Sequence, residues 1–351
     1  MYGMRNAKDF SEKESKVTDR VKLAFIGSGG IVRSHLEQGL KDFEDVEFAA
    51  WCDLNPETAQ ARREQVGGQG AIYTDARQML DEVKPDAVYI MLPPYAHGPS
   101  EALVIERRLP FFVEKPVAID LETALDVAGG VAKYGLLTSV GYMTRYRRSV
   151  QRVRELLQAQ TPVLLHGGWL LSRPTRYEGI WKWWVQKDKS GGQFLEQTTH
   201  TIDLARYLFG NVVRVYAVPV RDRRARPDFF TIEDASMVQL TFANGAAGNL
   251  YSSCSTSFGG GVSLTAWATD MRAEFTGWEH SVQITLPGDE QIAIPGEQNI
   301  FAYEDRAFVD SIKAGKNVGI LATYEDGLKA TAIACAANES MESGEVVEVG
   351  V

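Results

Sequence analysis

Short apolar runs alternate with segments of helical period along the first 143 residues. Runs in which nearly every position is hydrophobic are typical of strands that helices cover on both faces. Between two of these runs, Asp120 fits a helix N-cap and Gly135 a helix stop. Strands that alternate with helices predict an α/β domain with a parallel, doubly wound sheet, which we place at residues 21–142. The predicted strands are "VKLAFIG" (21–27), "VEFAAWCD" (46–53), "DAVYIML" (86–92), "PFFVEK" (110–115) and "LLTSVGYM" (136–143).

The pattern changes after residue 143. Helices are predicted at 145–158 and through "QFLEQTTHTIDLARYLFG" (193–210), and consecutive strand-like runs follow them. Asn244-Gly245 between two apolar runs is a strong hairpin signal, and Gly288-Asp289 marks a second turn. Hairpins indicate a mainly antiparallel sheet, so residues 143–351 are predicted to form an α+β domain. Two closing helices, at 301–314 and 324–342, are in a position to pack back on the first domain.

Charge and cysteine usage narrow the function classes. The formal net charge of -9 argues against a nucleic-acid or an anionic membrane partner. Cys52, Cys254 and Cys335 lie far apart without a C-x-x-C pair, so we expect neither a disulfide framework nor a metal site. No apolar span reaches eighteen residues, and residues 1–20 are polar and charged. We therefore expect a cytoplasmic protein, outside the membrane, with a disordered tail at 1–20.

A glycine-rich turn follows the first predicted strand and opens a helix. In "IGSGGIVRSH" (26–35), Gly27 and Gly29 fit the first two positions of G-x-G-x-x-G, and Val32 occupies the third. Such a turn holds a dinucleotide pyrophosphate at the helix N-terminus. Asp53, at the end of the second strand, fits the acid that bonds the adenosine ribose and repels a 2'-phosphate. We therefore expect a Rossmann domain that binds NAD, although Asp53 could instead start a turn, and Arg62 and Arg63 keep NADP possible.

The ligand crevice of such a sheet lies at the carboxyl ends of its strands. Lys115 stands at one of these ends, in "EKP" (114–116), and "LPPYAH" (92–97) follows the neighbouring strand. A lysine at a strand end is by itself often only a solvated cap. Here two segments meet at one edge, so we expect cofactor contacts from Ser28, Gly30, Ile31, Leu92, Pro93, His97, Glu114 and Lys115, in addition to Gly27, Gly29 and Asp53.

Several motifs together resemble the Gfo/Idh/MocA oxidoreductases, the family of glucose-fructose oxidoreductase and inositol dehydrogenase. They are "GSGGIVRSH", "DAVYIMLPPYAHGPSEAL" followed by "VEKP", "GYMTRYRRSVQRVREL", "GGQFLEQTTHTIDLARYLFG", "AFVDSIKAGK" and "AANESMESGEVVEV", spread over residues 21–349. The resemblance implies a C-terminal domain whose large open sheet commonly makes subunit contacts, hence a homo-oligomer, either a dimer or a tetramer. It also implies a sugar or inositol-like polyol as substrate.

The resemblance also assigns the catalytic residues. Lys115 would lie beside the nicotinamide and the substrate hydroxyl, and His200 would be the general acid/base. Glu196 stands where many members have aspartate. Its spacing of four residues from His200 would put both on one face of a single helix, with Asp203 close to that face. A histidine that takes the hydroxyl proton and an ammonium that stabilises the developing negative charge suit alcohol oxidation.

Other residues remain open between a functional and a structural role. The substrate-binding candidates are Arg145, Tyr146, Trp183 and His200, with "WKWW" (181–184) as either core packing or an apolar wall for a sugar. His97 would border the cofactor crevice, and His35 would help the first helix to pack. The favoured function is an NAD(P)-dependent dehydrogenase acting on a secondary alcohol. The alternatives are a non-catalytic dinucleotide- or sugar-sensing regulator of the same fold, and an enzyme with a nondissociable cofactor.

Overall fold

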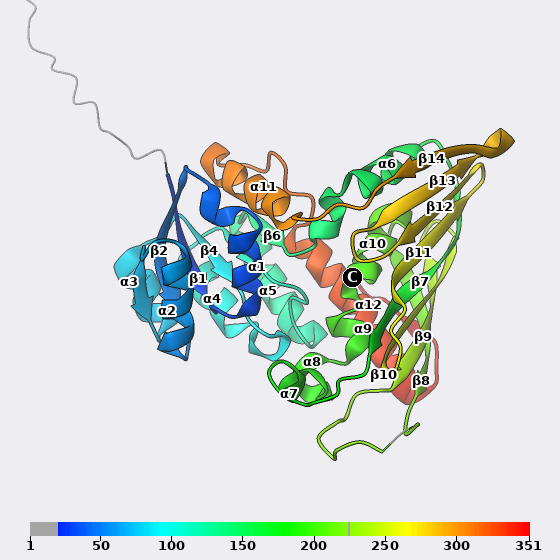
Figure 1. Cartoon of the computed structure of the whole chain (residues 1–351), viewed down its shortest axis with the longest axis horizontal. Coiled ribbons are helices and arrows are strands. Elements are labelled where there is room, and N and C mark those ends of the chain that lie inside the picture. Colours follow the sequence, from blue (N-terminus) through cyan, green and yellow to red (C-terminus); the bar gives the residue numbers. More distant parts are fainter. Residues whose placement is uncertain (1–19, 224) are drawn as a thin grey trace, which may run out of the picture.

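A computed structural model describes residues 20–223 and 225–351 of the chain (Figure 1). The first sheet has six parallel strands in the order β3-β2-β1-β4-β5-β6. This confirms the predicted doubly wound sheet. The short strand β3 was not predicted, because its three residues, one exposed and two half-buried, follow Gly67, Gly68 and Gly70 and carry little hydrophobic signal. The strands are β1 (Val21–Ile26), β2 (Val46–Cys52), β3 (Ala71–Tyr73), β4 (Ala87–Ile90), β5 (Phe111–Val113) and β6 (Thr138–Val140).

Local capping explains where the helices of this half begin. Asn55 accepts a hydrogen bond from the Glu57 amide at the start of α2, and Asp120 does the same for Thr123 in α5. Gly135 ends α5 in a left-handed conformation, as the sequence predicts. The helices are α1 (Gly30–Glu37), α2 (Pro56–Gln65), α3 (Ala76–Val83), α4 (Pro99–Glu106) and α5 (Leu121–Tyr134), with short 3-10 turns η1 (Leu40–Asp42), η2 (Pro94–Ala96) and η3 (Met143–Tyr146).

The second sheet has nine strands in the order β14-β13-β12-β11-β7-β10-β9-β8-β15. Only the pairing of β7 with β10 is parallel, so the sheet is mainly antiparallel, as predicted. Both predicted turns are present, with positive φ at Gly245, Gly288 and Asp289. The strands are β7 (Pro162–Ser172), β8 (Val212–Val220), β9 (Ala235–Phe242), β10 (Ala247–Thr256), β11 (Gly261–Ala268), β12 (Met271–Thr276), β13 (Ser281–Leu286), β14 (Glu290–Ile294) and β15 (Val347–Glu348), with η4 (Pro287–Asp289) between the last two hairpin strands.

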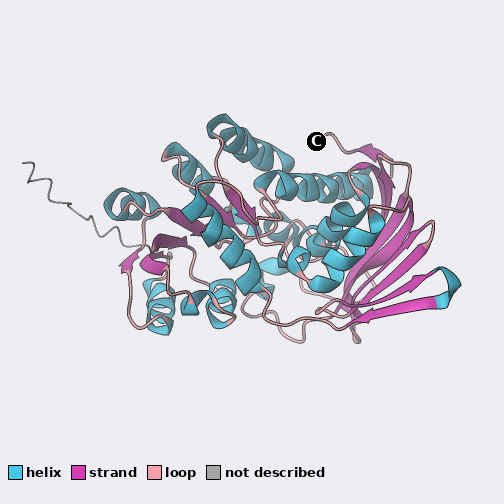
Figure 2. Ribbon diagram, turned by 90° about the horizontal axis from the view of Figure 1, so that it is seen from above, coloured by secondary structure: helices cyan, strands magenta, loops and turns pink. Residues whose placement is uncertain are grey.

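Helices lie between the two sheets and cover one face of the second sheet, whose other face is open in the described part of the chain (Figures 1 and 2). The closing helix α11 contacts α1 and β1, and α12 contacts α5, α10 and β8. The chain end therefore ties the two sheets together. These helices are α6 (Arg148–Leu157), α7 (Trp181–Trp184), α8 (Lys187–Ser190), α9 (Gln193–Glu196), α10 (Thr199–Phe209), α11 (Phe301–Ala314) and α12 (Tyr324–Ser343).

One predicted helix is broken in the structure. Residues 193–210 form α9 and α10, which are separated at Gln197 and Thr198. The Thr198 amide donates to the carbonyl of Gln193, five residues back, so the turn between the two helices is wider than an α-helical turn.

The tail expected at residues 1–20 lies outside the described residues, apart from Arg20. In the described ranges, no helix combines the length and apolarity needed to cross a membrane.

Candidate active site

The glycine-rich turn fits the phosphate groups of a dinucleotide. Gly27 has φ +86°, and a Cβ atom there would lie 2.3 Å from the carbonyl oxygen of Met91, so only glycine suits this position. A Cβ atom on Gly29 or Gly30 would face open space at the start of α1, so nothing crowds the side from which a pyrophosphate would approach the helix N-terminus. Val32 replaces the third glycine of the motif but is fully buried in the core beneath α1. The departure from the fingerprint is therefore accommodated by packing.

Asp53 lies beside this turn, at the end of β2. One carboxylate oxygen accepts a hydrogen bond from the Ser28 amide at 2.9 Å, and the other accepts one from the Asn55 amide at 2.9 Å. The carboxylate thus supports the local turn and also stands against the phosphate-binding loop, where a ribose would follow. Arg62 and Arg63 lie on α2 and donate to Gln65 and Gln60, respectively.

Lys115 and Glu196 meet across the two halves of the chain. The ammonium of Lys115 donates to the Glu196 backbone oxygen at 3.1 Å and to its carboxylate at 3.3 Å. The other carboxylate oxygen of Glu196 accepts a hydrogen bond from the indole of Trp184. The Lys115 side chain is 13% exposed, so the charge is mostly buried but still reached by solvent. A charge-assisted contact of this kind orients the ammonium.

His200 lies on α10 and is surrounded by aromatic rings. Its ring centroid is 5.5 Å from that of Trp278, 5.9 Å from Trp169 and 6.0 Å from Tyr142. Its Nδ1 atom has no hydrogen-bond partner among the described residues. Burial, followed by the positive charges of Lys115, His280 and Arg147, lowers the pKa of His200 well below its ordinary value. The ring is therefore neutral at neutral pH and able to accept a proton.

The wide turn between α9 and α10 corrects the expected relation of Glu196 to His200. The two residues belong to two helices, so ideal i, i+4 spacing does not bring them together. Both nevertheless belong to one site, because Lys115 contacts Glu196 directly and its charge acts on His200. Single-turn widenings of this type occur frequently at functional sites.

The remaining cofactor candidates divide into two groups. Leu92 lies against the glycine turn, since a Cβ on Gly27 would meet its side chain at 3.0 Å. Ser28 is buried with its hydroxyl unpartnered in the described structure, Ile31 is half-buried on α1, and Pro93 precedes η2. His97 is turned to Glu101, with Nδ1 and a carboxylate oxygen 2.6 Å apart. Glu114 points into the protein interior instead of the crevice, and is 4% exposed.

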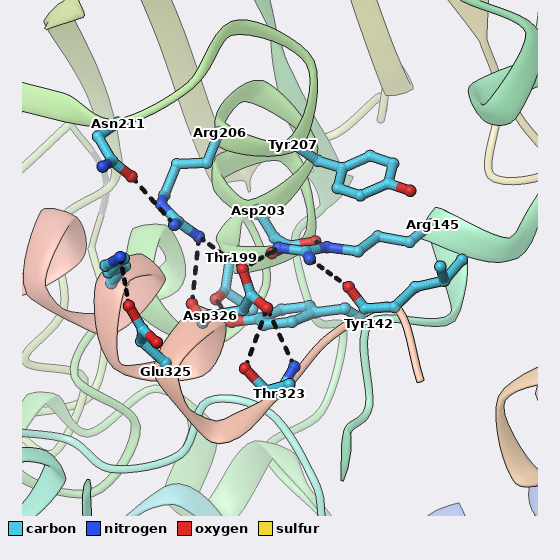
Figure 3. A network of polar contacts seen from close by, with 12 residues as sticks. Tyr142, Arg145, Thr199, Asp203, Arg206, Tyr207, Asn211, Thr323, Glu325 and Asp326 are labelled. Atoms are coloured by element: carbon cyan, nitrogen blue, oxygen red, sulfur yellow. Dashed lines mark hydrogen bonds and ion pairs between the residues drawn. The ribbon is translucent and has the colours of Figure 1, made fainter. Parts of the chain in front are cut away.

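Arg145 and Tyr146 are engaged with other parts of the protein; Figure 3 shows Arg145 beside Asp203 and Asp326. The Arg145 guanidinium donates to both carboxylate oxygens of Asp203, at 2.6 and 2.9 Å, and to Asp326 at 3.0 Å. The Tyr146 hydroxyl accepts a hydrogen bond from the Leu321 amide at 3.0 Å. With its donors held in this buried pair, Arg145 is not free to bind a hydroxyl group. Asp203, expected near the catalytic face, faces Arg145 instead.

The aromatic wall of the site comes from residues that the sequence did not single out. Trp183 is half-buried and meets the ring of Tyr95, at a centroid distance of 6.2 Å, whereas Trp169 and Trp278 lie next to each other beside His200. Trp169 lies on β7 and Trp278 on the β12–β13 turn, so neither carries a local motif. Arg147 fixes this turn by donating to the backbone oxygens of Trp278, Glu279 and Glu297.

His280, on the same turn, donates from Nδ1 to the Trp278 carbonyl at 2.8 Å. Burial and the charge of Arg147 lower its pKa from 6.5 to about 4. Within the described residues, no group of three or more His, Cys, Asp or Glu side chains is arranged to hold a metal ion.

Comparisons with known proteins agree with this arrangement. Residues 21–142 match the family model described as an oxidoreductase family with an NAD-binding Rossmann fold. Residues 150–283 match the GFO/IDH/MocA C-terminal domain.

Full-length relatives are similar along almost the whole chain. The scyllo-inositol 2-dehydrogenase (NAD(+)) of Bacillus subtilis is 26% identical over 95% of this chain and 97% of its own. The myo-inositol 2-dehydrogenase of Thermotoga maritima is 23% identical over 94% and 98%. The structure of levoglucosan dehydrogenase in complex with NADH superimposes with a TM-score of 0.84 at 20% identity, covering 94% of this chain and 99% of that chain. The chain therefore belongs to the GFO/IDH/MocA family of oxidoreductases and carries its NAD-binding Rossmann domain.

Proposed function

We propose that this protein is an NAD-dependent dehydrogenase that oxidises a secondary alcohol of a sugar, a sugar derivative or an inositol-like polyol. The observation that carries the proposal is the contact of Lys115, at the carboxyl edge of the first sheet, with Glu196, and it is supported by His200, which lies near enough for the charge of Lys115 to lower its pKa. The glycine turn and Asp53 stand at the same edge. The named activities of the inositol dehydrogenases that are similar to this chain support the substrate class.

Each residue of the site has a task that its surroundings allow. When bound, NAD supplies the acceptor for the hydride that leaves the alcohol carbon. The amides at Gly29 and Gly30 would hold its pyrophosphate, and Asp53 its ribose. The neutral ring of His200 is suited to take the hydroxyl proton. The ammonium of Lys115 would stabilise the negative charge that develops on the same oxygen.

Glu196 and Trp184 act through Lys115. The carboxylate of Glu196 accepts from both the ammonium and the indole, so it holds the ammonium in one place while remaining buried. Trp169 and Trp278 pack against each other, with ring centroids 5.1 Å apart, and both adjoin His200, so they would offer an apolar surface for the C–H face of a sugar or cyclitol. The polar groups at one end and the apolar rings at the other would orient a polyol with one hydroxyl toward Lys115.

A substrate screen tests the proposal. NADH absorbance is followed while inositols and sugars are offered with NAD or with NADP. We expect Lys115→Met and His200→Gln each to lower kcat by about 10²- to 10⁴-fold, because each removes a group that acts on the transferring proton or on the developing charge. Lys182→Met, which removes an exposed lysine of α7, is the matched control and should keep full activity. Turnover that survives the loss of both Lys115 and His200 would refute the assignment.

The same screen separates the alternative functions. A non-catalytic regulator would bind dinucleotide or sugar but give no turnover, and Lys115→Met would leave its cofactor affinity unchanged. An enzyme with a nondissociable cofactor would copurify with it, which the absorbance of the denatured protein would reveal. A neutral histidine near the partly exposed ammonium of Lys115 favours catalysis over sensing, because alcohol oxidation requires a proton acceptor and ligand binding alone does not.

We further propose that the open face of the second sheet joins subunits into a dimer or tetramer. This face carries exposed hydrophobic residues on the neighbouring strands β8 and β9 and on β7, one strand further along the sheet, namely Leu164, Tyr216, Val218 and Met237. Met237→Lys should shift the mass measured by light scattering toward the monomer. We place the protein in the cytoplasm, in keeping with cysteines that are few, far apart in the chain and without a C-x-x-C pair.

A further inference from the structure

A buried polar cluster lies beneath Lys115, outside the site described above. His35, on α1, has Nδ1 at 2.9 and 3.0 Å from the two carboxylate oxygens of Asp305 on α11. Its Nε2 lies 3.2 Å from Glu114, at the end of β5. The Tyr89 hydroxyl donates to Asp305 at 3.1 Å. All four side chains are buried, and they come from four elements that only the fold brings together.

The surroundings of His35 favour its charged form. Burial acts to lower its pKa, but the charge of Asp305 and the hydrogen bonds to Asp305 and Glu114 outweigh burial and raise the pKa well above its ordinary value. Both ring nitrogens face carboxylates, and only the imidazolium can donate from both. Glu304 lies close by, and burial raises its pKa well above the usual range. The cluster thus holds one buried cation between two carboxylates.

Glu114 connects this cluster to Lys115. One carboxylate oxygen faces His35, and the other accepts a hydrogen bond from the Lys115 backbone amide at 3.1 Å. The carboxylate lies against the backbone of Gly141, just after β6, where a Cβ atom would come within 2.7 Å of it, so only glycine at position 141 leaves room for Glu114. A continuous series of contacts therefore runs from Asp305 through His35 and Glu114 to the backbone of Lys115, whose ammonium then reaches Glu196.

We propose that His35 is a positioning residue: through Glu114 it fixes the backbone of Lys115, and hence the place of the ammonium in the active site. The inference rests on the proposed function of Lys115. His35 stands eight residues after Gly27, on the helix that would hold the pyrophosphate, so one side chain links the cofactor helix with the lysine strand. This explains why Glu114, which was expected to contact the cofactor, points inward.

Two variants test the proposal, together with a control. Glu114→Gln keeps the shape of the side chain but removes its charge, and His35→Gln removes the imidazolium. Both should lower kcat about tenfold, because small displacements of a catalytic group are costly, while the Kd for NAD stays within about twofold. The kcat of the double variant should be no lower than that of the single variant with the lower kcat, since both substitutions act through one contact. Thr138→Val is the control. Thr138 lies on β6, the strand next to β5, and its hydroxyl accepts a buried hydrogen bond from the Tyr324 amide, which the substitution removes. It should lower the melting temperature but keep kcat.

A second readout does not depend on turnover. The rate at which trinitrobenzenesulfonate modifies Lys115, followed by peptide mass spectrometry, reports on how firmly the ammonium is held. We expect modification to be about two- to fivefold faster in Glu114→Gln and His35→Gln, as for the loss of one ion pair. Unchanged modification and unchanged kcat in folded Glu114→Gln would overturn the inference. A higher Kd for NAD with unchanged kcat would also overturn it, since His35 would then serve only the cofactor helix. Faster modification in a protein that oxidises no polyol would uphold the inference and refute the proposed function.

Discussion

The buried pair of Arg145 and Asp203 offers the most direct test of the boundary between the active site and its scaffold. Asp203→Asn keeps the size of the side chain but removes the charge that faces the guanidinium. Arg145 would then retain Asp326, at 3.0 Å, and the Leu321 carbonyl as acceptors. Both side chains of the pair are almost fully buried, with 3% and 1% of their surface exposed. The variant therefore leaves the buried Arg145 cation with one of its two carboxylate partners.

The expected cost follows from this burial. Removing one partner of a buried ion pair typically costs about 3–5 kcal/mol, and the remaining contact with Asp326 places the expectation near the lower bound, about 3 kcal/mol. Replacing both partners, as in Arg145→Met with Asp203→Leu, should cost less than either single change, because no charge is left unpaired. Arg154→Met is the control. It removes a cation 3.7 Å from the centroid of Tyr207, the ring on which Arg145 also rests, and it should cost at most about 1 kcal/mol.

Thermal unfolding, followed by tryptophan fluorescence, measures these differences. For a chain of this size 1 kcal/mol corresponds to roughly 2 °C, so Asp203→Asn should lower the melting temperature by about 6 °C. Turnover per folded molecule should change little. The opposite result, a stable Asp203→Asn protein that has lost turnover, would show that Arg145 contacts the substrate, and it would refute the structural role argued from its contacts.

Three further predictions follow from the site. Asp53→Ala should reduce the preference for NAD over NADP, because the carboxylate no longer repels a 2'-phosphate. An unchanged ratio of the kcat/KM values for NAD and NADP would show that Asp53 serves only the local turn, where it accepts from the Asn55 amide. Trp278→Ala should raise KM for the polyol and leave KM for NAD unchanged, whereas Trp183→Ala should alter neither. The third concerns acid stability: the pKa of His280 is about 4 when folded and 6.5 when unfolded, so the unfolded state binds the proton first and stability falls below pH 6.5. Buried His200 contributes a loss of the same sign, so urea titrations should show that His280→Asn loses about 2 kcal/mol less stability by pH 5 than the unsubstituted protein; an equal loss in both proteins would contradict this.

Features that depend on neighbouring residues could be predicted from the sequence. Continuous apolar runs predicted the parallel strands, because only doubly covered strands need both faces hydrophobic. Asp120 and Gly135 bounded α5 correctly, since capping and left-handed backbone are local properties. The hairpin at Gly245 follows from the same local chemistry. The glycine turn and Lys115 were placed at one sheet edge by topology alone, since parallel strands end together.

Contacts between distant elements could not be predicted in this way. Arg145 is 58 residues from Asp203, and nothing in "TRYRR" indicates that its charge is matched inside the protein. Trp278 reaches His200 only because β12 and β13 bring their turn over α10. The wide turn at Thr198, which separates Glu196 from His200, includes a backbone hydrogen bond from the Thr198 amide to the Gln193 carbonyl. No residue type in this segment predicts that bond.

The sequence by itself therefore determined the parallel sheet, the cofactor turn and the position of Lys115, since each arises from local backbone preference and from the order of strands. Only the tertiary structure decided which charges face one another. His35 and Asp305 are 270 residues apart in the chain, yet they meet in a buried cluster that holds Glu114 and the backbone of Lys115. Such contacts are needed because burying a charge costs free energy unless an opposite charge or a hydrogen-bonding group within the protein replaces water. That partner can come from any part of the sequence.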